Sequence, residues 1–219
     1  DYDSTSNTGC RIKYANISNP TSGNFDPVIS GGWSSTHLVT GKYDNSSNTN
    51  YQVSISVSHS KLKDTHMLFT GWAGKQTNER SYFVNNVFIN GSLEGDNAPN
   101  FLVKNNIFLN SSFSTTSFDL KNNILDGCSI SRFYSQLHSY GFNDQYYVFS
   151  NNYINTRITK FQLGESINFE NNTYYCETGD NVTGTVNYFT GNNITGGTGS
   201  KYVMDSGSNL NAENNYWGN

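Results

Sequence analysis

The residues best suited to chemistry lie close together between His59 and His66. Alternate residues of an extended strand share one face, so His59, Lys61 and Lys63 could point the same way, with Asp64 and His66 following. A histidine, a lysine and a carboxylate could together carry out general acid–base catalysis. A solvated strand face followed by a polar turn explains the same residues without catalysis, and we favour that interpretation.

Other charged residues do not form a stronger candidate. Arg157, Lys160 and Glu165 form a small cluster, for which we expect a surface ion pair. A calcium site or a glycosidase needs several carboxylates at close quarters. Asp119 and Asp126 flank one turn, but no acidic residues recur at matching offsets nearby. We therefore predict a protein that is not an enzyme, with no catalytic residue, metal site or cofactor.

A six-residue frame recurs along the chain and must set the positions of all these side chains. The frame reads apolar, any, Asn, Asn, any, apolar. Its copies begin at Phe83, Val103, Leu120, Phe149, Phe169 and Ala212, with a looser copy at Phe189. The starts are separated by 20, 17, 29, 20, 20 and 23 residues. A period near 20 indicates a solenoid in which each repeat is one coil.

The frame predicts an all-β, right-handed parallel β-helix of roughly ten coils. Its two apolar positions lie five residues apart, so a bend at Asn-Asn is needed to point both inward. Asn suits such a bend because it tolerates the left-handed region. Helical repeats would need strong helix formers, which this composition lacks. We expect the first Asn of each pair to form a stacked ladder at Asn85, Asn105, Asn122, Asn151, Asn171 and Asn214.

The chain is expected to form one domain over residues 1–219. Regular coils are predicted for residues 62–219, with irregular first coils over residues 1–60 and a loop insertion at about 129–147. The frame at Leu62–Met67 is placed one coil before Phe83, with Asp-Thr at the turn. Weaker copies are Leu38–Tyr43 and Ile12–Ile17.

Composition narrows the function. A net charge of −4 with 14% charged residues argues against a nucleic-acid partner. No apolar run is long enough for a membrane span. The chain begins at Asp1, which we take as the mark of a processed or excised piece. Cys10, Cys128 and Cys176 form no CxxC motif, so either one disulfide with an odd thiol or three buried thiols is expected, with Cys176 pointing inward.

Two sets of surface residues could contact partners. Candidate glycosylation sequons begin at Asn16, Asn45, Asn90, Asn110, Asn181 and Asn193. One more sequon begins at the ladder residue Asn171. Tyrosines that fit the inner columns poorly could stack on sugars or anchor protein contacts, or pack under loops or between subunits. These candidates are Tyr146, Tyr147, Tyr153, Tyr175, Tyr188 and Tyr202.

The frame, with its closing Asn-Asn-Tyr-Trp-Gly-Asn at 214–219, resembles the right-handed parallel β-helix repeats of archaeal adhesin-like surface proteins. These occur especially in methanogens and belong to the wider pectate-lyase-like superfamily. The resemblance covers residues 62–219. It implies a non-enzymatic extracellular protein of the cell surface or envelope, an adhesin or a fibre module. A polysaccharide-binding or polysaccharide-degrading β-helix is the alternative.

The expected partners follow from the same interpretation. They are other copies of the chain, adjoining domains of a longer chain, or a cell-surface glycan or protein. The last coil keeps the full repeat register, with Trp217 in the inner column. We expect that end to meet another domain or another subunit, because unpaired strand edges invite pairing.

Overall fold

The computed structural model describes most of the repeat region and part of what precedes it. The described residues are 10–18, 37–40, 42–44, 49–51, 55–70, 81–96, 101–115, 118–133, 147–156, 161–163, 167–176, 182–184, 188–196, 202–204 and 211–218. The loop residue Tyr146, sequon residues Asn45 and Asn181, and the cluster at Arg157, Lys160 and Glu165 lie outside this part.

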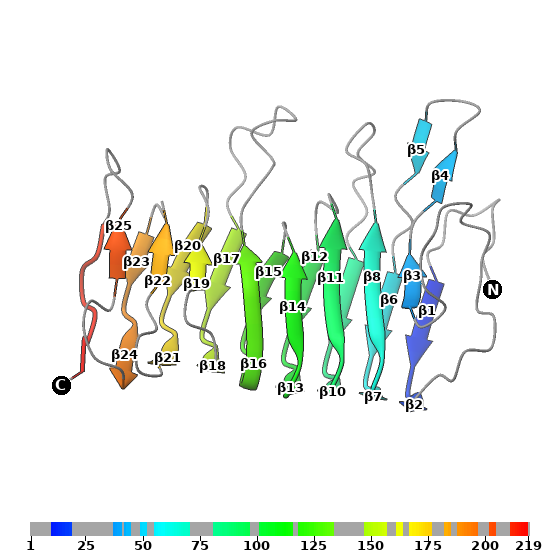
Figure 1. The fold of residues 1–219 in the computed structure, drawn as a ribbon, viewed down its shortest axis with the longest axis horizontal. Helices are drawn as coiled ribbons and strands as arrows, with labels where there is room; N and C mark the ends of the chain where they lie inside the picture. The colour runs from blue at the N-terminus through cyan, green and yellow to red at the C-terminus, as the bar shows by residue number, and fades with distance from the viewer. Residues whose placement is uncertain are drawn as a thin grey trace.

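The described chain is a parallel β-helix with three faces (Figure 1). The first face contains β1 (Cys10–Lys13), β6 (Ile55–Ser58), β9 (Ser81–Val84), β12 (Phe101–Lys104), β15 (Phe118–Lys121), β17 (Tyr147–Ser150), β20 (Ile167–Glu170) and β23 (Tyr188–Thr190). The second face contains β2 (Asn16–Ser18), β7 (Lys61–Lys63), β10 (Val87–Ile89), β13 (Ile107–Leu109), the start of β16 (Ile124–Phe133), β18 (Tyr153–Thr156), β21 (Thr173–Cys176) and β24 (Asn193–Gly196).

The third face closes each coil. It contains β3 (His37–Thr40), β8 (His66–Thr70), β11 (Ser92–Asp96), β14 (Ser112–Thr115), the end of β16, β19 (Phe161–Leu163), β22 (Val182–Gly184) and β25 (Tyr202–Met204). In Figure 1 these strands rise in front, the first-face strands descend behind, and the second face runs along the lower edge. The coils advance from right to left, so the winding is right-handed, as predicted.

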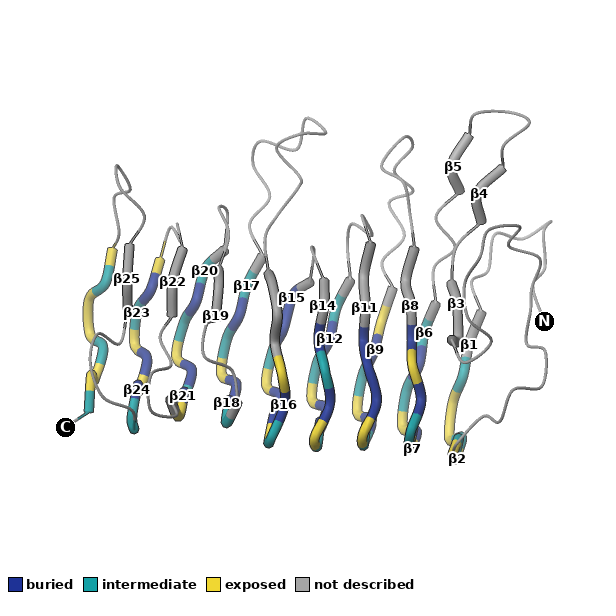
Figure 2. Tube along the Cα trace, in the orientation of Figure 1, coloured by how far each residue is buried: buried dark blue, intermediate teal, exposed yellow. Residues whose placement is uncertain are grey.

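All three faces contribute buried apolar residues to the interior, and buried residues recur from coil to coil along the stack (Figure 2). The two predicted columns are confirmed, because the register aligns Phe83 with Val103 on the first face and Phe88 with Phe108 on the second. The sequence did not reveal a third column, which contains Met67, Leu93 and Phe113. Rings stack along the first column; Phe169 and Phe189 lie 5.1 Å apart at 7°.

Each coil turns from the first face to the second at a corner that we call the first corner. Among the described residues it recurs nine times with a positive φ, at Tyr14, His59, Asn85, Asn105, Asn122, Asn151, Asn171, Gly191 and Asn214. The frame at Ile12–Ile17 is confirmed, because Ile12 aligns with Val57 and Ile17 with Leu62. Nine corners in the described residues compare with the roughly ten coils predicted.

A second corner joins the second face to the third. There, Asp64, Asn90, Asn110 and Gly127 take positive φ, each followed by a small residue.

The prediction that Leu62–Met67 precedes Phe83 in the same column is wrong. Leu62 aligns with Phe88, and the residue aligned with Phe83 is Val57. The frame matched because both corners have buried apolar residues five positions apart with a left-handed residue between them.

Two further predicted boundaries are corrected. Leu38–Tyr43 is not a corner, because Leu38 aligns with Met67 on the third face and β4 (Lys42–Asp44) pairs antiparallel with β5 (Thr49–Tyr51). Residues 129–133, assigned to the loop insertion, continue β16, where Ser129 aligns with Ser112. Within the described residues, no helix is long and apolar enough to cross a membrane.

Candidate contact surface on the second face

The candidate catalytic residues are spread over two corners. His59 occupies the first corner, where its Nε2 lies 3.2 Å from Asn85 Nδ2 and its ring 5.2 Å from that of Tyr14. Asp64 occupies the second corner, 3.9 Å from Lys63 Nζ. Because a whole strand of the second face separates the two corners, His59 and Asp64 do not converge on one substrate atom.

The remaining members of the cluster have separate surroundings. His66 lies beyond the second corner, with Nδ1 2.7 Å from Ser92 Oγ. Lys61 and Lys63 are exposed on the second face. In the described part of the chain, no group of three or more His, Cys, Asp or Glu could hold a metal ion.

The two acidic residues that flank one turn make separate local contacts. Asp119 is buried on the first face, where its carboxylate accepts a hydrogen bond from Val148 N at 2.9 Å and lies 3.4 Å from Lys121 Nζ. Asp126 is exposed on the second face and accepts a hydrogen bond from Asn155 Nδ2 at 2.8 Å. The two hydrogen bonds join neighbouring coils.

The buried asparagine ladder lies one residue after the predicted positions. Asn85, Asn105, Asn122, Asn151, Asn171 and Asn214 do occupy equivalent first-corner positions, but they are exposed and have positive φ. The second Asn of each pair points inward instead. The ladder is formed by Asn86, Asn106, Asn123, Asn152, Asn172, Asn192 and Asn215.

Each rung of this ladder satisfies buried backbone groups. Asn106 Oδ1 accepts hydrogen bonds from Asn86 N at 2.8 Å and Asn86 Nδ2 at 3.1 Å. Asn106 Nδ2 donates to Phe83 O at 2.8 Å and to Asn123 Oδ1 at 3.0 Å. An amide is required here because it both donates and accepts, whereas a carboxylate only accepts.

The second corner has a ladder of small hydroxyl and thiol side chains. Thr65 Oγ1 donates to Lys63 O at 3.0 Å and Ser111 Oγ to Leu109 O at 2.9 Å. Cys128 occupies the same place as a buried free thiol, with Sγ 3.4 Å from Phe108 O. Burial raises the pKa of the Cys128 thiol to about 12. Cys10 and Cys176 lie in strands, but their side chains are outside the described part.

The outward side chains of the second face form two rows that run along the solenoid. One row contains Lys61, Val87, Ile107, Ile124, Tyr153 and Thr173, and the other contains Lys63, Ile89, Leu109, Asp126, Asn155 and Tyr175. Successive members of a row lie on neighbouring strands, which are about 4.8 Å apart. The exposed Asn residues of the two corners border these rows.

An apolar patch occupies the middle of these rows. We define it as Val87, Ile89, Ile107, Leu109, Ile124 and Tyr153. Ile107 is 39% exposed, and Ile124 and Tyr153 are each 44% exposed. Val87, Ile89 and Leu109 are half-buried between them. Contiguous apolar side chains on the outside of a sheet are typical of interaction sites. The patch is therefore the best candidate for a functional surface among the described residues.

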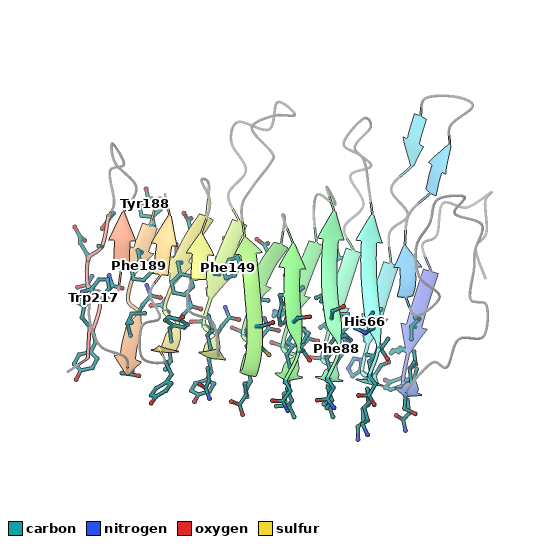
Figure 3. All side chains as sticks on the ribbon, viewed as in Figure 1. His66, Phe88, Phe149, Tyr188, Phe189 and Trp217 are labelled. Atoms are coloured by element: carbon teal, nitrogen blue, oxygen red, sulfur yellow. The ribbon has the colours of Figure 1, made fainter. Side chains whose placement is uncertain are left out.

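The predicted tyrosines separate into different surroundings. Tyr153 and Tyr175 lie on neighbouring strands of the second face but in different rows, because Tyr153 aligns with Thr173 and Asn155 with Tyr175. Tyr188 is exposed on the first face near the end of the described stack (Figure 3). Tyr147 and Tyr202 lie in strands, with side chains outside the described part.

The sequon residues that the structure describes gather around the second face. Asn16 and Asn193 are exposed on its strands. Asn90 and Asn110 are exposed at the second corner, directly after Ile89 and Leu109. A glycan at Asn90 or Asn110 would stand on the rim of the apolar patch.

The last described coil continues the interior stack. Asn193 pairs with Tyr216 in a parallel bridge, and the Trp217 ring lies 5.5 Å from that of Phe189 at 14° (Figure 3). Trp217 remains 36% exposed, so its predicted inner-column position is only partly covered. Comparison of the chain with protein-family models, curated proteins and solved structures gives no match.

Proposed function

We propose that this chain is a non-enzymatic extracellular module of an adhesin or envelope fibre, and that the second face is its contact surface. The apolar patch is the observation that carries the proposal. The interior is already filled by three columns, so Ile107 and Ile124 on the outside add little to the core of the chain. Apolar side chains on an outer face favour a role in contact.

The construction of the coil supports a mechanical role. Strands inside the stack have parallel partners on both sides, as β13 has in β10 and β16. The asparagine ladder adds hydrogen bonds between coils at the first corner. A solenoid held by contacts between neighbouring coils is a stiff support for a contact surface. The resemblance to methanogen surface proteins is consistent with this role.

A polysaccharide-binding module is the second candidate. Tyr153 and Tyr175 are 44% and 46% exposed on the same face, and exposed tyrosine rings can stack on sugar rings. The exposed corner Asn residues could supply hydrogen bonds beside them. If the chain binds a polysaccharide without cleaving it, that binding is one form of the proposed contact function. If it cleaves the polysaccharide, the chain is an enzyme.

Surface display tests the contact function. Bacterial cells would display the chain, and we would measure their clumping and their attachment to pectate-coated and chitin-coated beads. We expect more clumping or attachment than for cells that do not display the chain. The double variant Ile124→Ser, Tyr153→Ser should lose this increase. Tyr82→Ser is the matched control, because Tyr82 is 41% exposed on the first face.

A second assay separates binding from catalysis. Purified chain would be incubated with pectate, xylan and chitin, with and without calcium, and soluble products would be measured. We expect no products. Turnover that His59→Ala or Asp64→Asn abolishes would overturn the proposal, as would display that changes neither clumping nor attachment.

A further inference from the structure

We propose that the second face binds the second face of another copy of this chain, with the two solenoid axes antiparallel. In this pair, Lys63 of each copy faces Asp126 of the other. The inference rests on the proposed function, because it names the partner of the same contact surface. It follows from the order of side chains along the two outward rows.

The apolar patch is bounded by opposite charges. Along one row the order is Lys63, Ile89, Leu109, Asp126, on the successive strands β7, β10, β13 and β16. Along the other row it is Lys61, Val87, Ile107, Ile124. Positive charge therefore lies at one end of a short apolar segment and negative charge at the other.

A two-fold axis parallel to the strands, placed between β10 and β13, makes this segment complementary to itself. The operation puts β10 against β13 of the other copy and β7 against β16, and it keeps each row opposite itself. Ile89 then meets Leu109, Val87 meets Ile107, and Lys63 meets Asp126. The aliphatic stem of Lys61 covers Ile124, as long lysine side chains commonly do on apolar surfaces.

The other face-to-face arrangement is electrostatically unfavourable. With the two-fold axis along the solenoid, the coils would run in the same direction and Lys61 would face Lys63. Like charges directly opposed across an interface disfavour pairing. Asp64, 3.9 Å from Lys63, would offset only part of that repulsion because both side chains are well exposed. Charge order thus selects the antiparallel arrangement.

The contact is small. Six strands, β2 to β18, overlap in this arrangement, which gives a length of about 29 Å at about 4.8 Å a strand. With a width of about 13 Å, each copy buries about 400 Å² before side chains interdigitate, well below the roughly 800 Å² of a standard interface. We therefore expect a weak dimer in solution that many displayed copies would strengthen by avidity.

Glycans would compete with this pairing. The sequon residues Asn90 and Asn110 follow directly after the patch residues Ile89 and Leu109. A glycan on either would stand in the space of the other copy. The experiment therefore uses chain produced in a host without N-glycosylation.

A charge exchange tests the proposal. Sedimentation velocity would be measured for the wild type, for K63E, for D126K and for an equimolar mixture of the two variants, from roughly 1 µM to 1 mM. We expect the wild type to dimerise as concentration rises and each variant alone to stay monomeric. The mixture should dimerise again, because each interface then pairs opposite charges at both ends.

The outcomes discriminate between arrangements. A monomeric wild type throughout the series, or a mixture no more associated than its components, would overturn the proposal. Stronger association of K63E alone would indicate the parallel arrangement, in which Lys61 would gain an opposite charge. Ile107→Lys should also abolish dimers, whereas Tyr82→Ser on the first face should leave them unchanged; circular dichroism would verify folding of every variant.

This result is separable from that of the surface-display experiment. Cells that attach to glycan-coated beads while the purified chain stays monomeric would refute the pairing and leave the contact function intact. If cells that display the wild-type chain neither attach to the beads nor clump, the contact function itself is refuted.

Discussion

Truncation of one rung of the asparagine ladder, Asn106→Ala, should be among the most destabilising single substitutions in the described chain. Asn106 is 1% exposed and joins three coils. Its side chain accepts two hydrogen bonds from Asn86 and donates one each to Phe83 O and Asn123 Oδ1. Alanine would remove all four and leave Asn86 N and Phe83 O buried without these partners.

The magnitude follows from those four bonds. An intramolecular hydrogen bond contributes about 0.5–1.5 kcal/mol net, and a buried polar group left unpaired costs about 1–3 kcal/mol. Because the losses in one network are not additive, we expect Asn106→Ala to lower the free energy of unfolding by about 3–6 kcal/mol. Asn106→Asp should be comparably harmful, since a buried carboxylate cannot donate to Phe83 O.

The neighbouring residue supplies the control. Asn105 has φ +56 and an exposed side chain whose Oδ1 accepts one bond of 3.3 Å from Asn122. Glycine adopts positive φ without a Cβ penalty, and Gly191 already does so at the equivalent corner. Asn105→Gly should therefore change the free energy of unfolding by less than about 1 kcal/mol.

Urea unfolding followed by far-ultraviolet circular dichroism would measure both variants. The slope must be compared as well as the midpoint, because solenoids can lose coils separately and depart from two-state behaviour. Equal destabilisation by Asn105→Gly and Asn106→Ala would refute the assignment of the ladder to the second Asn. So would a loss below about 1 kcal/mol for Asn106→Ala.

The remaining predictions concern the core and the second corner. Phe108→Ala should lower the free energy of unfolding by about 3–5 kcal/mol in urea titrations, and Val87→Ala by far less, since of the two only Phe108 is fully buried. Equal losses would contradict the assignment of Phe108 to the interior and Val87 to the outside. Gly91→Ala should cost about 2–3 kcal/mol by the same measurement, because its Cβ would lie 2.3 Å from Thr65 O, and a neutral result would contradict that close approach. Cys128 should resist thiol reagents at pH 8 until the chain unfolds. Its pKa rises from 9.0 to about 12 on folding, so stability should fall as pH rises through that interval; Cys128→Ser should remove this slope.

The repeat period made the fold predictable, but it did not show which Asn of each pair is buried at the first corner. Two adjacent Asn residues have the same donors, acceptors and tolerance of the left-handed region, so their types do not reveal which is buried. The looser copy contained the distinguishing signal. Gly191 takes the first place there with φ +66, which marks the first place as the left-handed one. Asn192 is then the ladder residue.

The second corner was hidden because its residues vary. The segments from Leu62, Phe88, Phe108 and Leu125 each run apolar, any, Asn or Asp or Gly, small, any, apolar. Hydroxyl or thiol side chains occupy the inward place at three of these corners, since a short donor to the preceding backbone suffices, as Ser111 shows with Leu109 O. Glycine occupies it at the fourth, as Gly91. A frame defined by one amide pair therefore detected one corner of each coil and misassigned Leu62–Met67.

The apolar patch could not be recognised from sequence for a different reason. Strands such as Val87–Ile89 and Ile107–Leu109 contain three consecutive apolar residues, a pattern that predicts burial on both faces. In the β-helix only the middle residue points inward, and the flanking two face outward. Consequently Ile107 and Leu109 contribute less to the folding of one chain than Phe108 does, and substitutions there should change association more than stability. Comparing Phe108→Ala with Ile107→Lys separates these effects: the first should shift the unfolding midpoint, and the second should shift the sedimentation of a chain that unfolds at nearly the same urea concentration.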